Sequence, residues 1–142
     1  MNELNYASLE ASKKLVDNGI VLETDFYWRV WPERDKFKSG TEIVTTEVML
    51  ALMNNDNFYE NDVPGVVYYP APCFTEVWRE LPEEYINKNN TLFHLTAEKQ
   101  RGFTAANYIS RRGVCAKINN PMHTNPTDAL IDLLVWLKGA GK

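Results

Sequence analysis

The strongest pattern of hydrophobic positions lies near the end of the chain. From 129 to 137 every residue except Asp132 is apolar. This pattern predicts a helix that is apolar almost all the way round, and such a helix needs cover on more than one side. Asn125 is placed to cap the helix, Pro126 to occupy its first position, and Asp128 to reach back toward the cap. We expect this helix to pack between a sheet and another helix.

Two further helices follow from apolar residues spaced three or four apart. The segment 8–19 has Ser8 at the N-cap position and Gly19 where a helix ends in a left-handed residue. The segment 74–81 gathers its apolar side chains on one face and is followed by Pro82. The segment 8–19 predicts a surface helix that packs one side against a sheet, and the segment 74–81 predicts a helix with one apolar face.

The segment 24–31 alternates in the manner of a β-strand. Phe26, Trp28 and Val30 share the face that we expect to meet the core. Residues 66–69 predict a second, short strand. The opposite face of the first strand carries Tyr27, Arg29 and Trp31.

Three more strands are predicted toward the C-terminus, at 91–97, 103–110 and 114–119. Short turns containing glycine separate them, which indicates an antiparallel meander.

The segment between the first two strands is the hardest to interpret. Residues 33–40 read as a polar turn, and Ile43 and Val44 favour a strand. Residues 48–53 are compatible with either a helix or a strand, because periodicity does not separate the two in short apolar runs. Residues 54–65 read as a long loop and a candidate functional segment.

Together these elements predict an α+β fold. We expect an antiparallel sheet made of the C-terminal three-stranded meander plus one to three further strands, with about three helices packed mainly on one face. At 142 residues the chain is most simply a single domain spanning 1–142.

The composition of the chain bears on secretion, membrane association and disulfide bonding. The first residues lack the basic and apolar regions of a signal peptide, and no apolar stretch reaches the roughly 18 residues of a membrane span. Cys73 and Cys115 are too few to form a disulfide framework. We therefore expect a cytoplasmic protein with no membrane association.

Charge is distributed unevenly along the chain, whose net charge is −4. Residues 42–84 carry nine carboxylates against Arg79 alone, whereas residues 98–117 are basic. Basic residues interleaved with aromatics on a sheet are able to follow a nucleic-acid strand, although opposite ends of one strand separate the two clusters by roughly 20–25 Å. Nucleic-acid contact is thus an alternative function, and its candidate residues are Lys99, Arg101, Arg111 and Arg112.

The residues that usually carry catalysis form no recognisable motif. The cysteines and histidines are far apart in sequence, unlike the close pairs of zinc sites. His94 and Cys115 lie on the first and third meander strands, so the middle strand would separate them. The carboxylate pairs Asp128/Asp132 and Glu76/Glu80 read as solvated helix faces, and no phosphate-binding glycine loop is present. We assign no catalytic residue, metal or cofactor.

Aromatic residues suggest an interaction surface. Two aromatics flanking an arginine are typical of interface hot spots, as at Tyr27, Arg29 and Trp31. Val135 and Trp136 lie outside the main leucine stripe of the last helix, where a homodimer contact would use them.

One resemblance covers most of the chain outside 42–65. The turn 69–72 (Tyr-Pro-Ala-Pro), the pair Leu81-Pro82 and the closing helix with Asp128-Ala129-Leu130 and Trp136 resemble small uncharacterised proteins encoded by phages, prophages and mobile elements of gut bacteria. The resemblance implies an accessory protein made inside a bacterial cell and carries no activity or functional residue. We expect a non-enzymatic protein that acts through protein contact or self-association, with nucleic-acid association second and an enzyme third.

Overall fold

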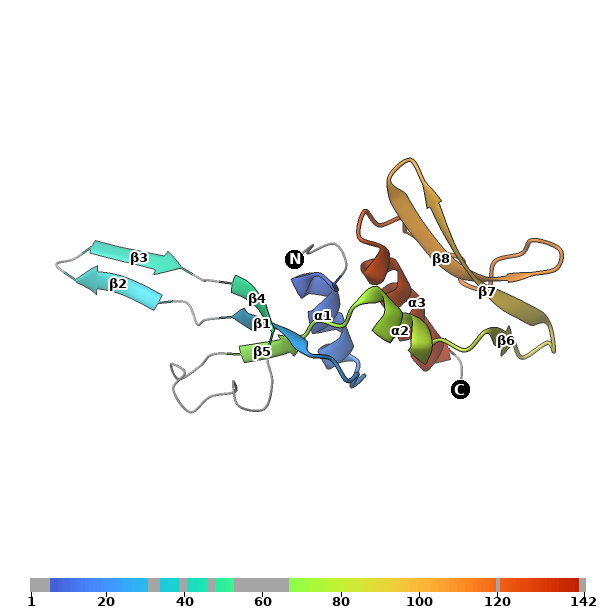
Figure 1. Cartoon of the computed structure of the whole chain (residues 1–142), viewed down its shortest axis with the longest axis horizontal. Coiled ribbons are helices and arrows are strands. Elements are labelled where there is room, and N and C mark those ends of the chain that lie inside the picture. The colour runs from blue at the N-terminus through green and yellow to red at the C-terminus, as the bar shows by residue number, and fades with distance from the viewer. Residues whose placement is uncertain are drawn as a thin grey trace.

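The computed structural model describes residues 6–30, 67–119 and 121–140, together with the backbone of 34–38, 41–45 and 48–52. These residues form three helices and antiparallel strands, so the predicted α+β class is confirmed (Figure 1). The helices are α1 (Leu9–Asp17), α2 (Phe74–Glu80) and α3 (Pro126–Ala140). The strands are β1 (Phe26–Val30), β2 (Arg34–Lys38), β3 (Thr41–Thr45), β4 (Val48–Leu52), β5 (Val67–Pro70), β6 (Glu84–Ile86), β7 (Leu92–Gln100) and β8 (Phe103–Ser110).

The strands are divided among three antiparallel sheets. Their orders are β4-β1-β5, β2-β3 and β6-β7-β8. Figure 1 shows the helices between the two three-stranded sheets, with the β2–β3 hairpin projecting away from them. A C-terminal three-stranded meander is present, but its central strand is β7 rather than the predicted 103–110.

Helix α3 lies at the centre of the core, as its pattern predicts. It contacts β8, α2 and α1, and Leu130, Ile131, Leu133 and Leu134 are completely buried. Cover from three directions explains why an apolar residue occupies nearly every position of this helix. In the described parts of the chain, no helix is both long enough and apolar enough to cross a bilayer.

The two shorter helices begin and end as predicted. The Ser8 hydroxyl accepts the Ala11 N–H at 3.2 Å and caps α1, and Gly19 has a φ of +68° just beyond its end. At the start of α2, the Cys73 N–H donates to the Glu76 carboxylate at 2.8 Å. Glu76 therefore caps its own helix, and the interpretation of Glu76 and Glu80 as a solvated pair is wrong for Glu76.

Two sequence interpretations of the middle segment are resolved by strand pairing. The predicted polar turn at 33–40 is wrong, because 34–38 form β2 and pair with β3. Backbone pairing in a hairpin overrides the low strand preference of charged residues. Residues 48–52 are strand rather than helix, and they pair with β1. The predicted loop at 54–65 lies outside the described residues, as does Trp31.

The predicted strand at 114–119 is also wrong, although the segment does run beside β8. A β-bridge joins Ile109 to Cys115, and a later one joins Thr104 to His123. Between these two bridges, the side chain of Asn107 makes the hydrogen bonds to Lys117 that a strand backbone would otherwise make. The Asn107 amide donates to the Lys117 carbonyl at 2.9 Å, and its side-chain oxygen accepts the Lys117 N–H at 3.1 Å. An irregular segment therefore covers this edge of β8.

The third strand of the meander is instead β6, which precedes β7. Its three residues, Glu-Tyr-Ile, are too few to show a period of two. The strand forms because Tyr85 packs inward against Phe93 and Tyr108, with ring centroids 5.9 and 5.8 Å apart. Aromatic packing thus fixes an element that sequence periodicity does not reveal.

Candidate functional site

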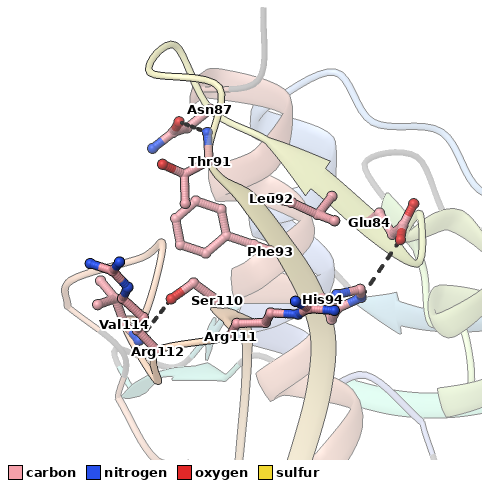
Figure 2. A pocket seen from close by; sticks show the side chains of 10 residues that line it. All are labelled: Glu84, Asn87, Thr91, Leu92, Phe93, His94, Ser110, Arg111, Arg112 and Val114. Atoms are coloured by element: carbon pink, nitrogen blue, oxygen red, sulfur yellow. Dashed lines mark hydrogen bonds and ion pairs between the residues drawn. The ribbon is translucent and has the colours of Figure 1, made fainter.

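A hollow of about 760 Å³ opens at one end of the β6-β7-β8 sheet, where β6 turns into β7 and where β8 ends. We call it the turn-end hollow (Figure 2). Apolar side chains, small polar side chains and two arginines line it together. The lining residues are Glu84, Asn87, Thr91, Leu92, Phe93, His94, Ser110, Arg111, Arg112 and Val114.

The β6–β7 turn forms one wall of the turn-end hollow. The side-chain oxygen of Asn87 accepts the N–H groups of Asn89 and Thr91, each at 2.9 Å. The Asn87 N–H in turn donates to the Thr91 carbonyl at 3.1 Å, and Asn90 has a φ of +65°. Asparagine tolerates this left-handed conformation better than most residues do. The turn is therefore held by its own hydrogen bonds.

A second ordered turn, which follows β8, forms the opposite wall and carries both arginines. Ser110 makes three contacts across it: its N–H donates to Val114, its carbonyl accepts from Gly113, and its hydroxyl accepts from Val114. Gly113 has a φ of +84°, a region that favours glycine. This geometry fixes the backbone positions of Arg111 and Arg112 relative to β7.

The charges of the turn-end hollow are arranged across the sheet. Glu84 on β6 lies opposite His94 on β7, with 3.7 Å between the Glu84 carboxylate and the imidazole Nδ1. Figure 2 shows the Arg111 side chain running toward His94. Within the described residues, neither Arg111 nor Arg112 has a carboxylate at ion-pair distance. The hollow therefore has an acidic side at β6 and an unneutralised basic side at the β8 turn.

Exposed apolar side chains accompany these charges on β6, on β7 and in the β8 turn. Leu92 is 41% exposed and Val114 is 58% exposed. Ile86, which pairs with Leu92 across β6 and β7, is 60% exposed. Single exposed apolar residues are ordinary, but a group of them beside unpaired arginines is typical of an interaction surface.

A separate polar cluster joins α1, α3 and the segment along β8. One oxygen of Asp132 accepts Lys14 Nζ at 2.6 Å, and the other lies 2.5 Å from His123 Nε2. Asp128, one turn earlier, accepts the Ser8 N–H at 2.8 Å. The reading of Asp128 and Asp132 as a solvated pair is therefore wrong, and Asp128 caps a different helix from the one that carries it.

The pKa values of the two aspartates shift in opposite directions, although burial acts to raise both. Burial raises the pKa of Asp128, and the hydrogen bonds from Ser8 offset this only in part. Burial also acts to raise the pKa of Asp132, but the hydrogen bonds and charges of Lys14 and His123 outweigh it and lower that pKa. Burial lowers the pKa of Lys117 nearby, against the attraction of Asp132. Because each Asp132 oxygen has a partner from a different part of the chain, the cluster holds α1, α3 and the segment along β8 together.

The cysteine–histidine pair considered from sequence does not come together. His94 lies opposite Ile109, and Ile109 lies opposite Cys115, so β8 separates the two side chains. Both are exposed. Within the described residues, no group of three histidine, cysteine or carboxylate side chains is placed to hold a metal ion.

The four candidate nucleic-acid contacts lie at opposite ends of β8. Lys99 and Arg101 flank the β7–β8 turn, whereas Arg111 and Arg112 follow the last residue of β8. Eight strand residues separate the pairs, which corresponds to roughly 26 Å. The structure brings only Arg111 and Arg112 into one hollow.

The residues proposed from sequence as an interface are mostly half-buried. Trp136 meets Tyr85 edge-on, with ring centroids 5.4 Å apart, and Val135 packs against the core. Tyr27 and Arg29 lie on the central strand of the β4-β1-β5 sheet. Their role in an interface stays a prediction.

Sequence reasoning identified Arg111 and Arg112 but missed the other residues of the turn-end hollow. One signal was available: the dipeptide Arg111-Arg112 precedes Gly113 directly after a predicted strand. In comparisons with protein-family models, curated proteins and solved structures, no match to this chain was found.

Proposed function

We propose that this chain is a non-enzymatic accessory domain that acts by contacting a protein through the turn-end hollow. The observation that carries this proposal is the position of Arg111 and Arg112, which lack a carboxylate partner within the described residues and flank exposed Leu92 and Val114. Arginine next to apolar side chains is enriched in protein interfaces, because guanidinium groups make directional hydrogen bonds and also stack on apolar surface.

The rigidity of both walls supports a binding role. Each wall is a turn closed by internal hydrogen bonds, so little backbone entropy is lost when a partner docks. The surface is also mixed in character, since exposed Leu92 and Val114 lie close to Glu84 and the two arginines. A partner segment that combines carboxylates with apolar side chains matches it.

The polar cluster of Asp132 supports the same reading. A histidine beside a carboxylate is the beginning of many catalytic sites, but catalysis also requires a nucleophile or substrate within reach. Here Asp132 holds Lys14 as well as His123, so both of its carboxylate oxygens already have partners. The cluster is therefore better explained as a connection between helices.

A peptide titration tests the proposal. The probe is a synthetic peptide of alternating leucine and glutamate, compared with a peptide in which lysine replaces glutamate, and the readout is the backbone amide NMR spectrum. We expect the acidic peptide to shift the amides of Leu92, Arg112 and Val114, and the basic peptide to leave them in place. Equal responses to both peptides, or no response at these amides, would contradict the proposal.

Two variants sharpen the titration. Arg112→Glu reverses one charge at the turn-end hollow, whereas Arg101→Glu makes the same change at the opposite end of the sheet. Only Arg112→Glu is expected to abolish the response to the acidic peptide. A single-stranded oligonucleotide at low salt provides the competing test: shifts at both ends of β8 would favour nucleic-acid association instead.

A further inference from the structure

We infer that the turn-end hollow pairs with the same hollow of a second copy of this chain, forming a two-fold dimer. This inference rests on the proposed function and names the partner that the surface fits. The observation behind it is that the charges of the surface are self-complementary.

The acidic and basic sides lie on the two outer positions of the three-stranded sheet. Glu84 belongs to β6, Arg111 follows β8, and β7 runs between them. Adjacent strands are about 4.8 Å apart, so the two sides are separated by roughly 10 Å. Between them, on β7, stands the exposed side chain of Leu92, and exposed Ile86 lies beside it on β6.

A two-fold axis running parallel to β7 brings unlike charges together. Rotation about this axis places the β6 side of one copy over the β8 side of the other. Glu84 of each copy then faces Arg111 of its partner, and Leu92 meets Leu92 at the centre. An isologous contact needs a patch that is complementary to itself, and this patch meets that condition.

The surface also has the chemistry that a small interface requires. Apolar Leu92 lies on the middle strand, and charged Glu84 and Arg111 lie on the two outer sides, which follows the usual arrangement of core and rim. Because few apolar side chains contribute, we expect a weak dimer that forms at high protein concentration. Ion pairs at the rim are screened by salt, so added salt weakens association.

Sedimentation velocity of the full chain, over a concentration series from micromolar to millimolar, tests this inference. We expect the average mass of the unaltered protein to rise with concentration. Glu84→Arg and Arg111→Glu each place like charges across the interface, and each is expected to weaken association by about tenfold or more. Arg101→Glu, at the far end of the same sheet, is the matched control and is expected to associate normally.

A mixture of the two charge-reversed variants gives the decisive result. In a mixed dimer, the two reversed side chains face each other with opposite charges, and the unaltered Arg111 of one chain faces the unaltered Glu84 of the other. We therefore expect an equimolar mixture to associate although each variant alone does not. A mixture that remains monomeric, or a control that loses association equally, would overturn the inference.

Folding of the variants is checked by circular dichroism. A further variant tests the apolar part of the contact without changing any charge. Leu92→Ser shortens an exposed side chain at the centre of the contact and is also expected to prevent association. If the unaltered protein stays monomeric while the leucine–glutamate peptide still shifts the Leu92 and Val114 amides, the second copy is the wrong partner and the proposed function stands. If neither association nor peptide response occurs, both are refuted.

Discussion

Asp128, in the first turn of α3, accepts the backbone N–H of Ser8, the residue that caps α1. One carboxylate thus joins the starts of two helices, and Ser8 and Asp128 are 120 positions apart in sequence. A second link lies beside it, because the Asn125 amide donates to the Tyr6 carbonyl at 2.8 Å. These contacts fix α1 against α3 at its N-terminal end.

The Ser8–Asp128 link predicts different outcomes for two substitutions. Asp128→Ala leaves a partly buried N–H without its acceptor and is expected to cost about 1–3 kcal/mol of unfolding free energy. Asp128→Asn keeps an acceptor oxygen and removes a charge whose burial is unfavourable, so it is expected to lie within about 1 kcal/mol of the unaltered protein. Urea unfolding at pH 7 measures both. Equal losses of unfolding free energy in the two variants would show that the carboxylate charge, rather than the acceptor oxygen, stabilises the fold.

The raised pKa of Asp128 adds a pH dependence to this comparison. A folded pKa above the ordinary 3.8 favours folding below that value, and this advantage is lost as the pH rises through the folded pKa. The stability of Asp128→Asn relative to the unaltered protein is therefore expected to improve from pH 3 to pH 7. A constant difference across this range would contradict the assigned direction of the shift.

Asp132 is expected to show the opposite dependence. Its lowered pKa means that its contribution is complete above 3.8 and declines as the pH falls through the lower folded pKa. Asp132→Asn is expected to cost about 1–2 kcal/mol at pH 7, since one partner, Lys14, is half exposed and screened by solvent. Unfolding curves of both proteins should converge at acid pH. A gap that stays constant down to pH 2 would refute the assignment.

Asn107 is expected to hold the segment 114–119 along β8. Asn107→Ala removes both hydrogen bonds to Lys117 and is expected to cost about 1–3 kcal/mol. Hydrogen exchange of the Lys117 N–H should accelerate more than that of Leu133 in α3. Asn119→Ala, at an exposed position of the same segment, is the control and should change neither quantity.

Tyr108 provides a test at alkaline pH. Its hydroxyl donates to the Pro82 carbonyl at 2.6 Å, and burial raises its pKa from 10.0 to about 12. Tyr108 is thus expected to ionise after exposed tyrosines, and its contribution to stability should decline as the pH rises from 10 to about 12. An ultraviolet titration of Tyr108→Phe should lack the last-ionising tyrosine. Loss of an earlier one would contradict the assignment.

The parts of the fold that sequence predicts are those specified by local signals. The apolar run of α3 requires cover on several sides, and the structure supplies it from α1, α2 and β8. The cap at Ser8 and the left-handed Gly19 depend only on neighbouring residues. The structure agrees with these predictions because they depend on neighbouring residues and no distant contact overrides them.

The remaining features depend on contacts between distant residues. Lys14 and Asp132 are 118 positions apart, so no spacing rule reveals their ion pair. Asn107 replaces backbone pairing with a side chain, which turns a predicted strand into an irregular segment. The turn-end hollow likewise combines β6, β7 and the β8 turn, and only its two arginines stand out in the sequence.

The proposed role of this chain is protein contact at the turn-end hollow, with a second copy of the same chain as the partner. It is tested most directly by recording backbone amide NMR spectra of the unaltered protein at low and high concentration. We expect the amides of Leu92, Arg112 and Val114 to shift as the concentration rises, with no change at Arg101 and Gly102 on the opposite turn. Spectra that coincide at every concentration, or shifts confined to the opposite turn, would contradict it.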